Sequence, residues 1–221
     1  MPDLRNRNLR PTLIHEYKLR EAGYSHIAGV DEAGRGAWAG PIAAAAVILP
    51  LTDSDLASSL QNVRDSKLMT PSLRLTMYSR IQKTALCIGL GISSSEEVDE
   101  LGVLGATYQA MCRALHSLSI PPQHVLIDHL KLPNYPTPQT PLTKGDRDVL
   151  SIAAASIIAK VARDEIMKAW DSIYPGYGFS HHKGYGTFEH RKALQQLGPI
   201  HIHRKTFAPV TLQLIRNSRR S

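Results

Sequence analysis

The hydrophobic pattern between residues 27 and 92 predicts short buried strands joined by glycine-rich turns. Residues 27–31 form an apolar run that indicates a strand, and residues 41–49 form a second run rich in Ala, Val and Ile. The turn Gly34-Arg35-Gly36 connects these two runs, so we expect them to form an antiparallel pair. Residues 86–92 contain two glycines and are compatible with a third strand.

A long amphipathic helix is predicted next. Ser95, Glu96 and Glu97 place hydrogen-bond acceptors and negative charge at its N-terminus, and Pro121-Pro122 ends it. Residues 124–128 then form a short apolar run that closes on a carboxylate, which indicates another strand. The apolar stripe of the helix has alternate spacings of three and four residues, at Leu101, Leu104, Tyr108, Met111, Leu115 and Leu118.

The rest of the chain is predicted to be mostly helical. Residues 131–141 contain four prolines and are expected to form a loop. A second long helix is expected to run from Asp148 towards Ser172, followed by a glycine-rich loop over residues 174–186. A shorter helix follows Thr187, and a basic tail begins at Arg216. Antiparallel strands followed by helix–strand–helix alternation predict an α/β fold with a mixed central sheet flanked by helices.

Length and charge narrow the class of protein. With 221 residues and 43% hydrophobic content, we expect one domain over residues 1–221, in which residues 1–25 are too few to form a further domain. The 26 basic residues exceed the 19 acidic ones, which gives a formal charge of +7. This excess favours a polyanionic partner such as nucleic acid, although a merely soluble basic protein would show it equally.

The cysteine count and the lack of long apolar segments point to the cytoplasm. Cys87 and Cys112 have no metal-site spacing and provide no disulfide framework, which favours a reducing compartment. No apolar run approaches the length of a membrane span, and residues 1–10 lack the hydrophobic core of a signal peptide. We therefore expect a cytoplasmic protein without membrane contact.

Four carboxylates stand at the ends of predicted elements. Asp31 and Glu32 close the first strand, Asp128 closes a Val-Leu-Ile run, and Asp146 precedes the second long helix. Ligand sites in open α/β sheets lie beyond the carboxyl ends of the strands. Converging carboxylates raise one another's pKa unless a cation joins them, and oxygen ligands suit Mg²⁺ or Mn²⁺ better than zinc. The pattern predicts metal-assisted hydrolysis.

Each carboxylate also has a simpler explanation. An isolated Asp146 would more often cap the helix that follows it. Asp31 and Glu32 are also compatible with turn and surface positions, and adjacent strand residues normally point to opposite faces of a sheet. That divergence argues against one shared metal site, unless the strand twists or ends there. Asp128 is the hardest to explain otherwise, because an unpaired buried carboxylate is costly.

Several short motifs follow one another in a specific order. Residues 28–36 read Ala-Gly-Val-Asp-Glu-Ala-Gly-Arg-Gly, and Ala39-Gly40-Pro41 comes directly after them. Further segments are Asp65-Ser66-Lys67-Leu68, Val125-Leu126-Ile127-Asp128, Lys144-Gly145-Asp146, Ser151 to Asp164, His182-Lys183-Gly184-Tyr185 and His203-Arg204-Lys205-Thr206-Phe207. Over roughly residues 26–210 this series resembles the ribonuclease HII family, the type 2 ribonucleases H.

One position departs from the family pattern. His129 stands where members usually carry a glycine after the third carboxylate. A side chain tolerated beside the site is the simpler interpretation. The alternative hypothesis gives His129 a role near the attacking water or a phosphate.

The resemblance implies a ribonuclease H-like fold with a helical C-terminal part over about residues 174–221. It also implies that two Mg²⁺ or Mn²⁺ ions are held by Asp31, Glu32, Asp128 and Asp146. The implied reaction cuts the RNA strand of RNA–DNA hybrids on the 5′ side of ribonucleotides, including single ones embedded in duplex DNA. It leaves 3′-hydroxyl and 5′-phosphate ends and serves ribonucleotide removal and RNA-primer processing. We expect a monomer.

The resemblance also assigns substrate contacts. Gly34-Arg35-Gly36 resembles the family's sensor of the 2′-hydroxyl, because glycines let the backbone approach a sugar, although alone such a tripeptide is more often a plain turn. Tyr185 resembles the aromatic residue that stacks on a sugar next to the cut, and a packing role is equally compatible with it. Candidates for phosphate contacts, each of which could instead be an ordinary surface residue, are Ser66, Lys67, Lys160, Arg163 and Lys183.

Two other functions are compatible with parts of this pattern. Ribonuclease HIII shares the carboxylates, but it usually has a long N-terminal extension and a lysine in place of Arg35. A non-catalytic hybrid-binding protein on the same scaffold would gain nothing from four clustered negative charges. Both alternatives are therefore disfavoured.

Overall fold

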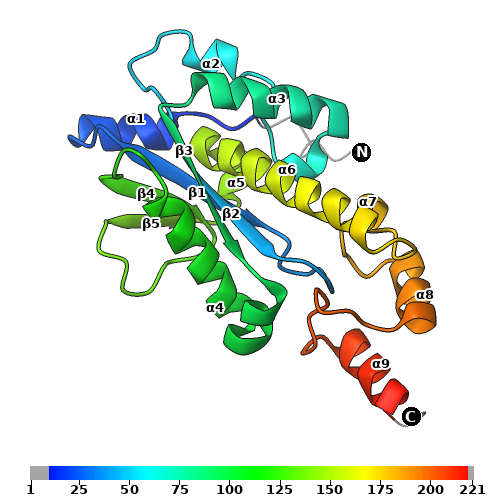
Figure 1. Ribbon diagram of the computed structural model, residues 1–221. Coiled ribbons are helices and arrows are strands. Elements are labelled where there is room, and N and C mark those ends of the chain that lie inside the picture. The colour runs from blue at the N-terminus through cyan, green and yellow to red at the C-terminus, as the bar shows by residue number, and fades with distance from the viewer. Residues whose placement is uncertain (1–9, 219–221) are drawn as a thin grey trace, which may run out of the picture.

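A computed structural model describes residues 10–218, which are built around a mixed five-stranded sheet of order β3-β2-β1-β4-β5 (Figure 1). Strand β1 (Ile27–Ala33) pairs antiparallel with β2 (Ile42–Ile48), and β2 pairs antiparallel with β3 (Cys87–Ser93). On its other side β1 pairs parallel with β4 (His124–Asp128), which pairs parallel with β5 (Gln139–Leu142). The predicted α/β fold with a mixed sheet is confirmed.

Two long helices cover the two faces of this sheet (Figure 1). Helix α6 (Leu150–Ile173) lies on one face of β1 and β2, and α4 (Ser95–His116) lies on the other face, against β2 and β3. Every residue of β2 is buried, because its alanine-rich sequence is enclosed between both helices. Burial on both faces explains why this strand reads as a continuous apolar run rather than an alternating one.

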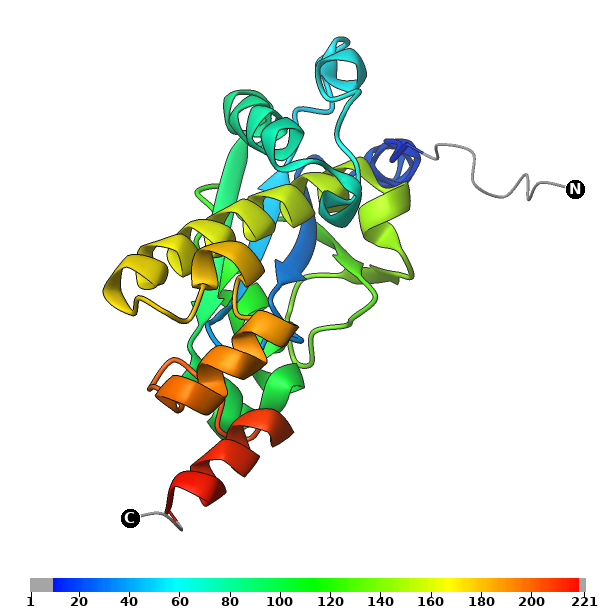
Figure 2. The same ribbon diagram turned by 90° about the vertical axis from the view of Figure 1, so that its right-hand side faces the viewer.

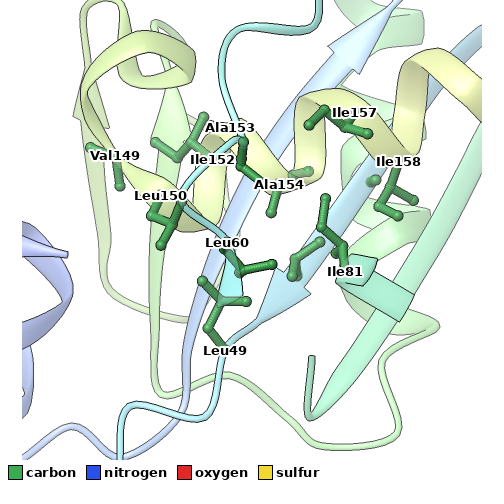
Figure 3. Packing of buried hydrophobic residues seen from close by; sticks show 14 of the residues in the cluster. Leu49, Leu60, Ile81, Val149, Leu150, Ile152, Ala153, Ala154, Ile157 and Ile158 are labelled. Carbon is green, nitrogen blue, oxygen red and sulfur yellow. The ribbon is translucent and has the colours of Figure 1, made fainter. Parts of the chain in front are cut away.

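The face under α6 carries the largest group of buried apolar side chains. Figure 3 shows Leu49, Leu60 and Ile81 together with Ala154 and Ile158 of α6. Two helices that the sequence pattern did not predict, α2 (Leu56–Ser59) and α3 (Pro71–Thr84), contribute to this layer. The N-cap of α3 is Thr70, whose side chain accepts a hydrogen bond from the Leu73 amide, and a proline follows it.

Helix α4 differs from its predicted form in its first turns. Gly102 has φ +71° and ψ 165°, which interrupts the helix and changes the direction of the residues that follow. Leu101 and Leu104 are each 46% exposed, so the predicted apolar stripe is wrong at its N-terminal end. The helix begins one residue earlier than expected, in a capping box in which Ser94 and Glu97 satisfy each other's backbone amides.

The remaining elements correct several boundaries. Strand β5 lies at the end of a segment predicted as a loop, and α7 (Phe179–His182) lies within the predicted glycine-rich loop. The second long helix, expected from Asp148, is α6 and begins at Leu150, and a short helix that was not predicted, α5 (Gly145–Asp148), precedes it. Three further elements had no prediction of their own: α1 (Ile14–Glu21), the 3₁₀ turn η2 (Ser66–Leu68) and α9 (Ala208–Ser218).

A helical C-terminal part is present at one end of the molecule. Helix α8 (Phe188–Leu197) starts after Thr187, as expected, and α8 and α9 lie far from α1 and α2 (Figure 2). The predicted N-terminal extension up to residue 9, and the last part of the predicted basic tail, residues 219–221, lie outside the described residues. Between residues 10 and 218, no helix is long and apolar enough to cross a membrane.

Candidate active site

Two of the predicted carboxylates lie side by side where β1 and β4 approach their carboxyl ends. Val30 pairs with Ile127 in the parallel ladder, so Asp31 and Asp128 follow as neighbours. Asp31 is buried, with 3% of its surface exposed. An Asp128 oxygen (Oδ1) accepts a 2.7 Å hydrogen bond from the Gly145 amide, which brings the start of α5 to the end of β4. This contact places Asp146, the next residue along α5, beside the same strand ends.

The simpler interpretation of Asp146 as a helix cap is wrong. Asp146 lies inside α5, and its side chain caps neither α5 nor α6. Its Oδ2 instead lies 3.3 Å from the Nζ of Lys67, which belongs to η2, and the carboxylate is 7% exposed. Asp146 is therefore oriented towards the cluster of charges rather than along the helix.

Glu32 joins the cluster although it is adjacent to Asp31 in the strand. The Glu32 amide donates to Asp31 Oδ1 over 2.7 Å, and its Oε1 lies 3.3 Å from the Arg35 guanidinium. Its second carboxylate oxygen, Oε2, is buried and has no hydrogen-bond partner. Burial raises the pKa of Glu32, and repulsion from Asp128 contributes to the shift. The divergence of adjacent strand residues therefore does not separate Glu32 from the other carboxylates.

The carboxylates destabilise one another's charged forms. Burial raises the pKa of Asp31 well above its ordinary value, and the negative charges of Glu32, Asp128 and Asp146 raise it further. Burial also raises the pKa of Asp146, again with a contribution from Asp128, while Lys67 opposes the shift. Such raised pKa values are expected where neighbouring carboxylates have no cation to balance their charges.

The donor set fits a hard divalent cation. All four groups are carboxylates, their charges are unfavourable without a counter-ion, and the orphaned Glu32 Oε2 is a buried acceptor that a cation would satisfy. Among residues 10–218, no group of three or more acidic, His or Cys side chains is already arranged as a metal cage. Asp31, Glu32, Asp128 and Asp146 are thus neighbours whose negative charges act on one another.

A cavity of 590 Å³ opens beside the carboxylates. It brings together residues from β1, η2, α3, α6 and the loop after α7, most of which the sequence had singled out. Its lining consists of Glu32, Ala33, Gly34, Arg35, Gly36, Ser66, Lys67, Arg74, Lys160 and Tyr185. Eight of the predicted site residues therefore share one concave surface.

The two glycines of the turn are in different surroundings. Gly34 has φ +98°, and a Cβ added to it would lie 2.0 Å from the Arg163 Nε. Gly36 is exposed, has no left-handed φ, and has no atom within 4 Å of an added Cβ. The fold therefore requires glycine at position 34 but not at position 36, where the bare backbone faces open space.

Two of the predicted phosphate contacts are not part of this cavity. Arg163 is fully buried and donates to the backbone carbonyls of Ala39, Pro41 and Lys183, so a contact between Arg163 and a phosphate is not supported. Lys183 bonds through Nζ to the Ser180 carbonyl and lines a neighbouring hollow of 100 Å³. In both cases backbone carbonyls satisfy the cation, from distant segments for Arg163 and from the neighbouring Ser180 for Lys183.

Arg74 of α3 is a cavity residue that sequence reasoning missed. Its Nε and Nη2 donate to the Ser66 and Met69 carbonyls over 3.0 and 2.9 Å, and its Nη1 lies 3.8 Å from Asp164. Arg74 thus supports the turn that carries Ser66 and Lys67. The Thr70-Pro71 start signal of α3 would have revealed the helix but not the direction of this side chain.

His129 has a backbone reason for its departure from the family pattern. Its φ is +58°, in the left-handed region that glycine adopts most readily and that His tolerates better than β-branched residues do. The side chain is exposed. These facts favour the simpler interpretation, a tolerated side chain beside the site.

Comparisons with known proteins identify the family of this chain. The family model "Ribonuclease HII" matches residues 28–210. Curated ribonuclease HII proteins from Chloroflexus aurantiacus and Thermus thermophilus are 48% and 50% identical to the chain, over 93% and 83% of it and 97% and 87% of their own lengths.

Solved structures also share the fold. The crystal structure of ribonuclease H2 from Pyrococcus horikoshii OT3 has a TM-score of 0.70 and 25% identity over 86% of this chain and 98% of that one. A crystal structure of Bst-RNase HIII in complex with Mn²⁺ has a TM-score of 0.64 over 90% of this chain and 72% of that one, and its 19% identity shows the fold alone. The chain belongs to the ribonuclease HII family, metal-dependent endonucleases that cleave RNA in RNA–DNA hybrids.

Proposed function

We propose that this chain hydrolyses the phosphodiester on the 5′ side of a ribonucleotide, including a single ribonucleotide embedded in duplex DNA. A water oxygen forms the new bond to phosphorus, and the bond from phosphorus to the 3′-oxygen of the preceding nucleotide breaks. The products carry a 3′-hydroxyl and a 5′-phosphate. The observation that carries the proposal is the cavity in which Glu32, the Gly34–Gly36 turn and basic side chains face one space.

The four carboxylates Asp31, Glu32, Asp128 and Asp146 would hold Mg²⁺ or Mn²⁺, with two ions in the active complex. Such ions supply positive charge that activates water and stabilises a departing oxygen. The Mn²⁺ complex of the ribonuclease HIII with the same fold supports this choice of metal. The chain itself fixes two of the ligands, because the Gly145 amide orients Asp128 and Lys67 favours the charged form of Asp146.

The rest of the cavity would bind the nucleic acid. The exposed Gly36 backbone leaves room for a sugar, and Gly34, Arg35 and Gly36 together would sense the 2′-hydroxyl. Tyr185 would stack on a sugar, with the Lys160 ammonium 5.8 Å from its ring centre. Lys67, whose side chain is 72% exposed beside its contact with Asp146, would reach a phosphate. Ser66 accepts a hydrogen bond from Ser156, so its own hydroxyl proton remains available for a phosphate oxygen.

This specificity would serve ribonucleotide removal from DNA and the processing of RNA primers. We infer that the protein acts in the cytoplasm as a single-domain monomer. The formal charge of +7 supports attraction to a polyanionic duplex.

A labelled duplex with one ribonucleotide tests the proposal. Wild-type protein should cut it only with Mg²⁺ or Mn²⁺, and end analysis should show a 3′-hydroxyl and a 5′-phosphate. Asp31→Asn and Asp128→Asn should each reduce cutting at least a hundredfold. The control is Asp148→Asn, since Asp148 lies on the same short helix as Asp146 but pairs with Arg147 outside the cluster. Near wild-type cutting by Asp128→Asn would refute the metal assignment.

A further inference from the structure

Two fully buried arginines enclose the segment that contains the Gly34–Gly36 turn. Arg163 comes from α6 and Arg204 from the stretch between α8 and α9, and both have 0% exposure. No carboxylate among residues 10–218 forms a salt bridge with either guanidinium. Buried charges of this kind are costly unless other polar groups satisfy them.

Backbone carbonyls take the place of the missing carboxylates. Arg204 donates from Nη1 to the Arg35 carbonyl over 2.8 Å, and from Nε and Nη2 to the Gly40 carbonyl over 3.0 and 2.9 Å. Arg163 donates to the Pro41 and Ala39 carbonyls over 2.9 and 3.1 Å. A planar guanidinium can satisfy several carbonyls at fixed directions, which a lysine ammonium on a flexible stem cannot reproduce.

These contacts hold the turn from two sides. The Arg163 side chain lies against the Cα of Gly34, since an added Cβ there would meet its Nε and Cδ at 2.0 and 2.6 Å. Arg204 holds the carbonyl of Arg35, the residue whose side chain pairs with Glu32. The backbone of the turn is therefore set by charges from two distant segments, α6 and the stretch between α8 and α9.

We propose that Arg163 and Arg204 are positioning residues for ribose recognition, which fix the backbone of the Gly34–Gly36 turn so that it separates ribose from deoxyribose. The inference rests on the proposed role of this turn as the 2′-hydroxyl sensor. A turn held at both Arg35 and Gly40 presents its groups in one arrangement. A loosened turn would still bind a duplex through its phosphates, but it would bind ribose and deoxyribose more equally.

The test measures sugar preference separately from catalysis. In an Asp128→Asn background, fluorescence anisotropy gives the affinity for a duplex with one ribonucleotide and for the matching all-DNA duplex. Arg204→Lys should reduce the ribose preference at least tenfold, with affinity for the all-DNA duplex within about twofold of the parent. Arg163→Lys should change the preference in the same direction. An unchanged preference in both folded variants would overturn the inference.

Controls separate positioning from loss of stability. Leu194→Ala removes a buried side chain of α8, and Arg216→Lys alters an exposed arginine of α9. Both should keep the parent preference, and an equal loss in Leu194→Ala would show that general destabilisation is the cause and reject the inference. If Arg204→Lys does not fold, Phe207→Leu replaces it, because the Arg204 guanidinium lies 5.3 Å from that ring. A parent without any ribose preference would instead refute the proposed 2′-hydroxyl sensor.

Discussion

Gly34 and Gly36 lie two residues apart in one turn, and alanine at these two positions should have different consequences, one for folding and the other for activity. Gly34 is required by the fold, since it has φ +98° and the Arg163 side chain lies directly against it. Gly36 has neither constraint, and its surroundings are open. If the open space is where a sugar approaches, Gly36→Ala should impair function alone, whereas Gly34→Ala should impair folding.

The magnitudes follow from the contacts. A non-glycine residue at a left-handed φ costs about 1–2 kcal/mol. An alanine Cβ at position 34, 2.0 Å from Arg163 Nε, would also displace the buried guanidinium, and each hydrogen bond to a charged group contributes about 1.5–3 kcal/mol. The loss of one such bond brings the total to roughly 3–5 kcal/mol, or a fall in Tm of about 6–20 °C for a chain of this size. Gly36→Ala should change the free energy of unfolding by only about 0.5 kcal/mol, and slight stabilisation is expected if anything.

Thermal unfolding and cleavage of a duplex with one ribonucleotide measure the two effects. Gly36→Ala should have the same Tm as the wild type and cleave at least tenfold more slowly. If the methyl group obstructs binding, the effect should be mainly a higher KM. Gly34→Ala should melt well below both. The reasoning would be refuted if Gly36→Ala cleaved at the wild-type rate, or if it lost as much stability as Gly34→Ala.

Three further predictions concern buried titratable groups. Burial lowers the pKa of His190 and His203 to about 4, so the unfolded chain takes up protons before the folded one as the pH falls below 6.5. The free energy of unfolding should therefore decrease between pH 6.5 and 4, by on the order of 3 kcal/mol for each histidine. Urea unfolding that gave the same free energy at pH 6.5 and pH 4 would contradict this. Burial and neighbouring charges raise the pKa of Asp31, so this group costs stability as the pH rises above 4; in EDTA at pH 8, Asp31→Asn should therefore melt above the wild type, and Mg²⁺ should stabilise only the wild type. Glu16 accepts a hydrogen bond from the second residue of α6, so Glu16→Ala should cost about 1 kcal/mol in urea unfolding, whereas Glu21→Ala on the exposed end of α1 should not.

Local patterns in the sequence were sufficient for the central sheet and for most of the cavity. An apolar run that closes on a carboxylate predicts both a buried strand and a polar strand end, which is how β1 with Asp31 and β4 with Asp128 were recognised. The order of the motifs then identified the turn, Lys67 and Tyr185 as one site, and the cavity brings these residues together. These features are predictable because burial and strand ends depend on residues close together in the chain.

Positions where long-range packing selects a side chain's partner were not predictable. Taken alone, Asp146 has the sequence context of a helix cap, and only the order of the motifs grouped it with the other carboxylates. Its contact with Lys67 depends on the docking of α5 on the end of β4, which no local pattern reports. Leu101 continues a helical stripe, but the backbone break at Gly102 leaves it exposed.

The sequence by itself predicted the class of fold and the family, and it singled out the acidic residues that the structure brings to neighbouring strand ends. Only the tertiary structure decided that Arg163 and Arg204 are buried against carbonyls instead of facing a phosphate. The physical reason is that a local pattern reports whether a side chain is apolar or charged. Which donor meets which acceptor across more than a hundred residues depends on how the completed elements pack.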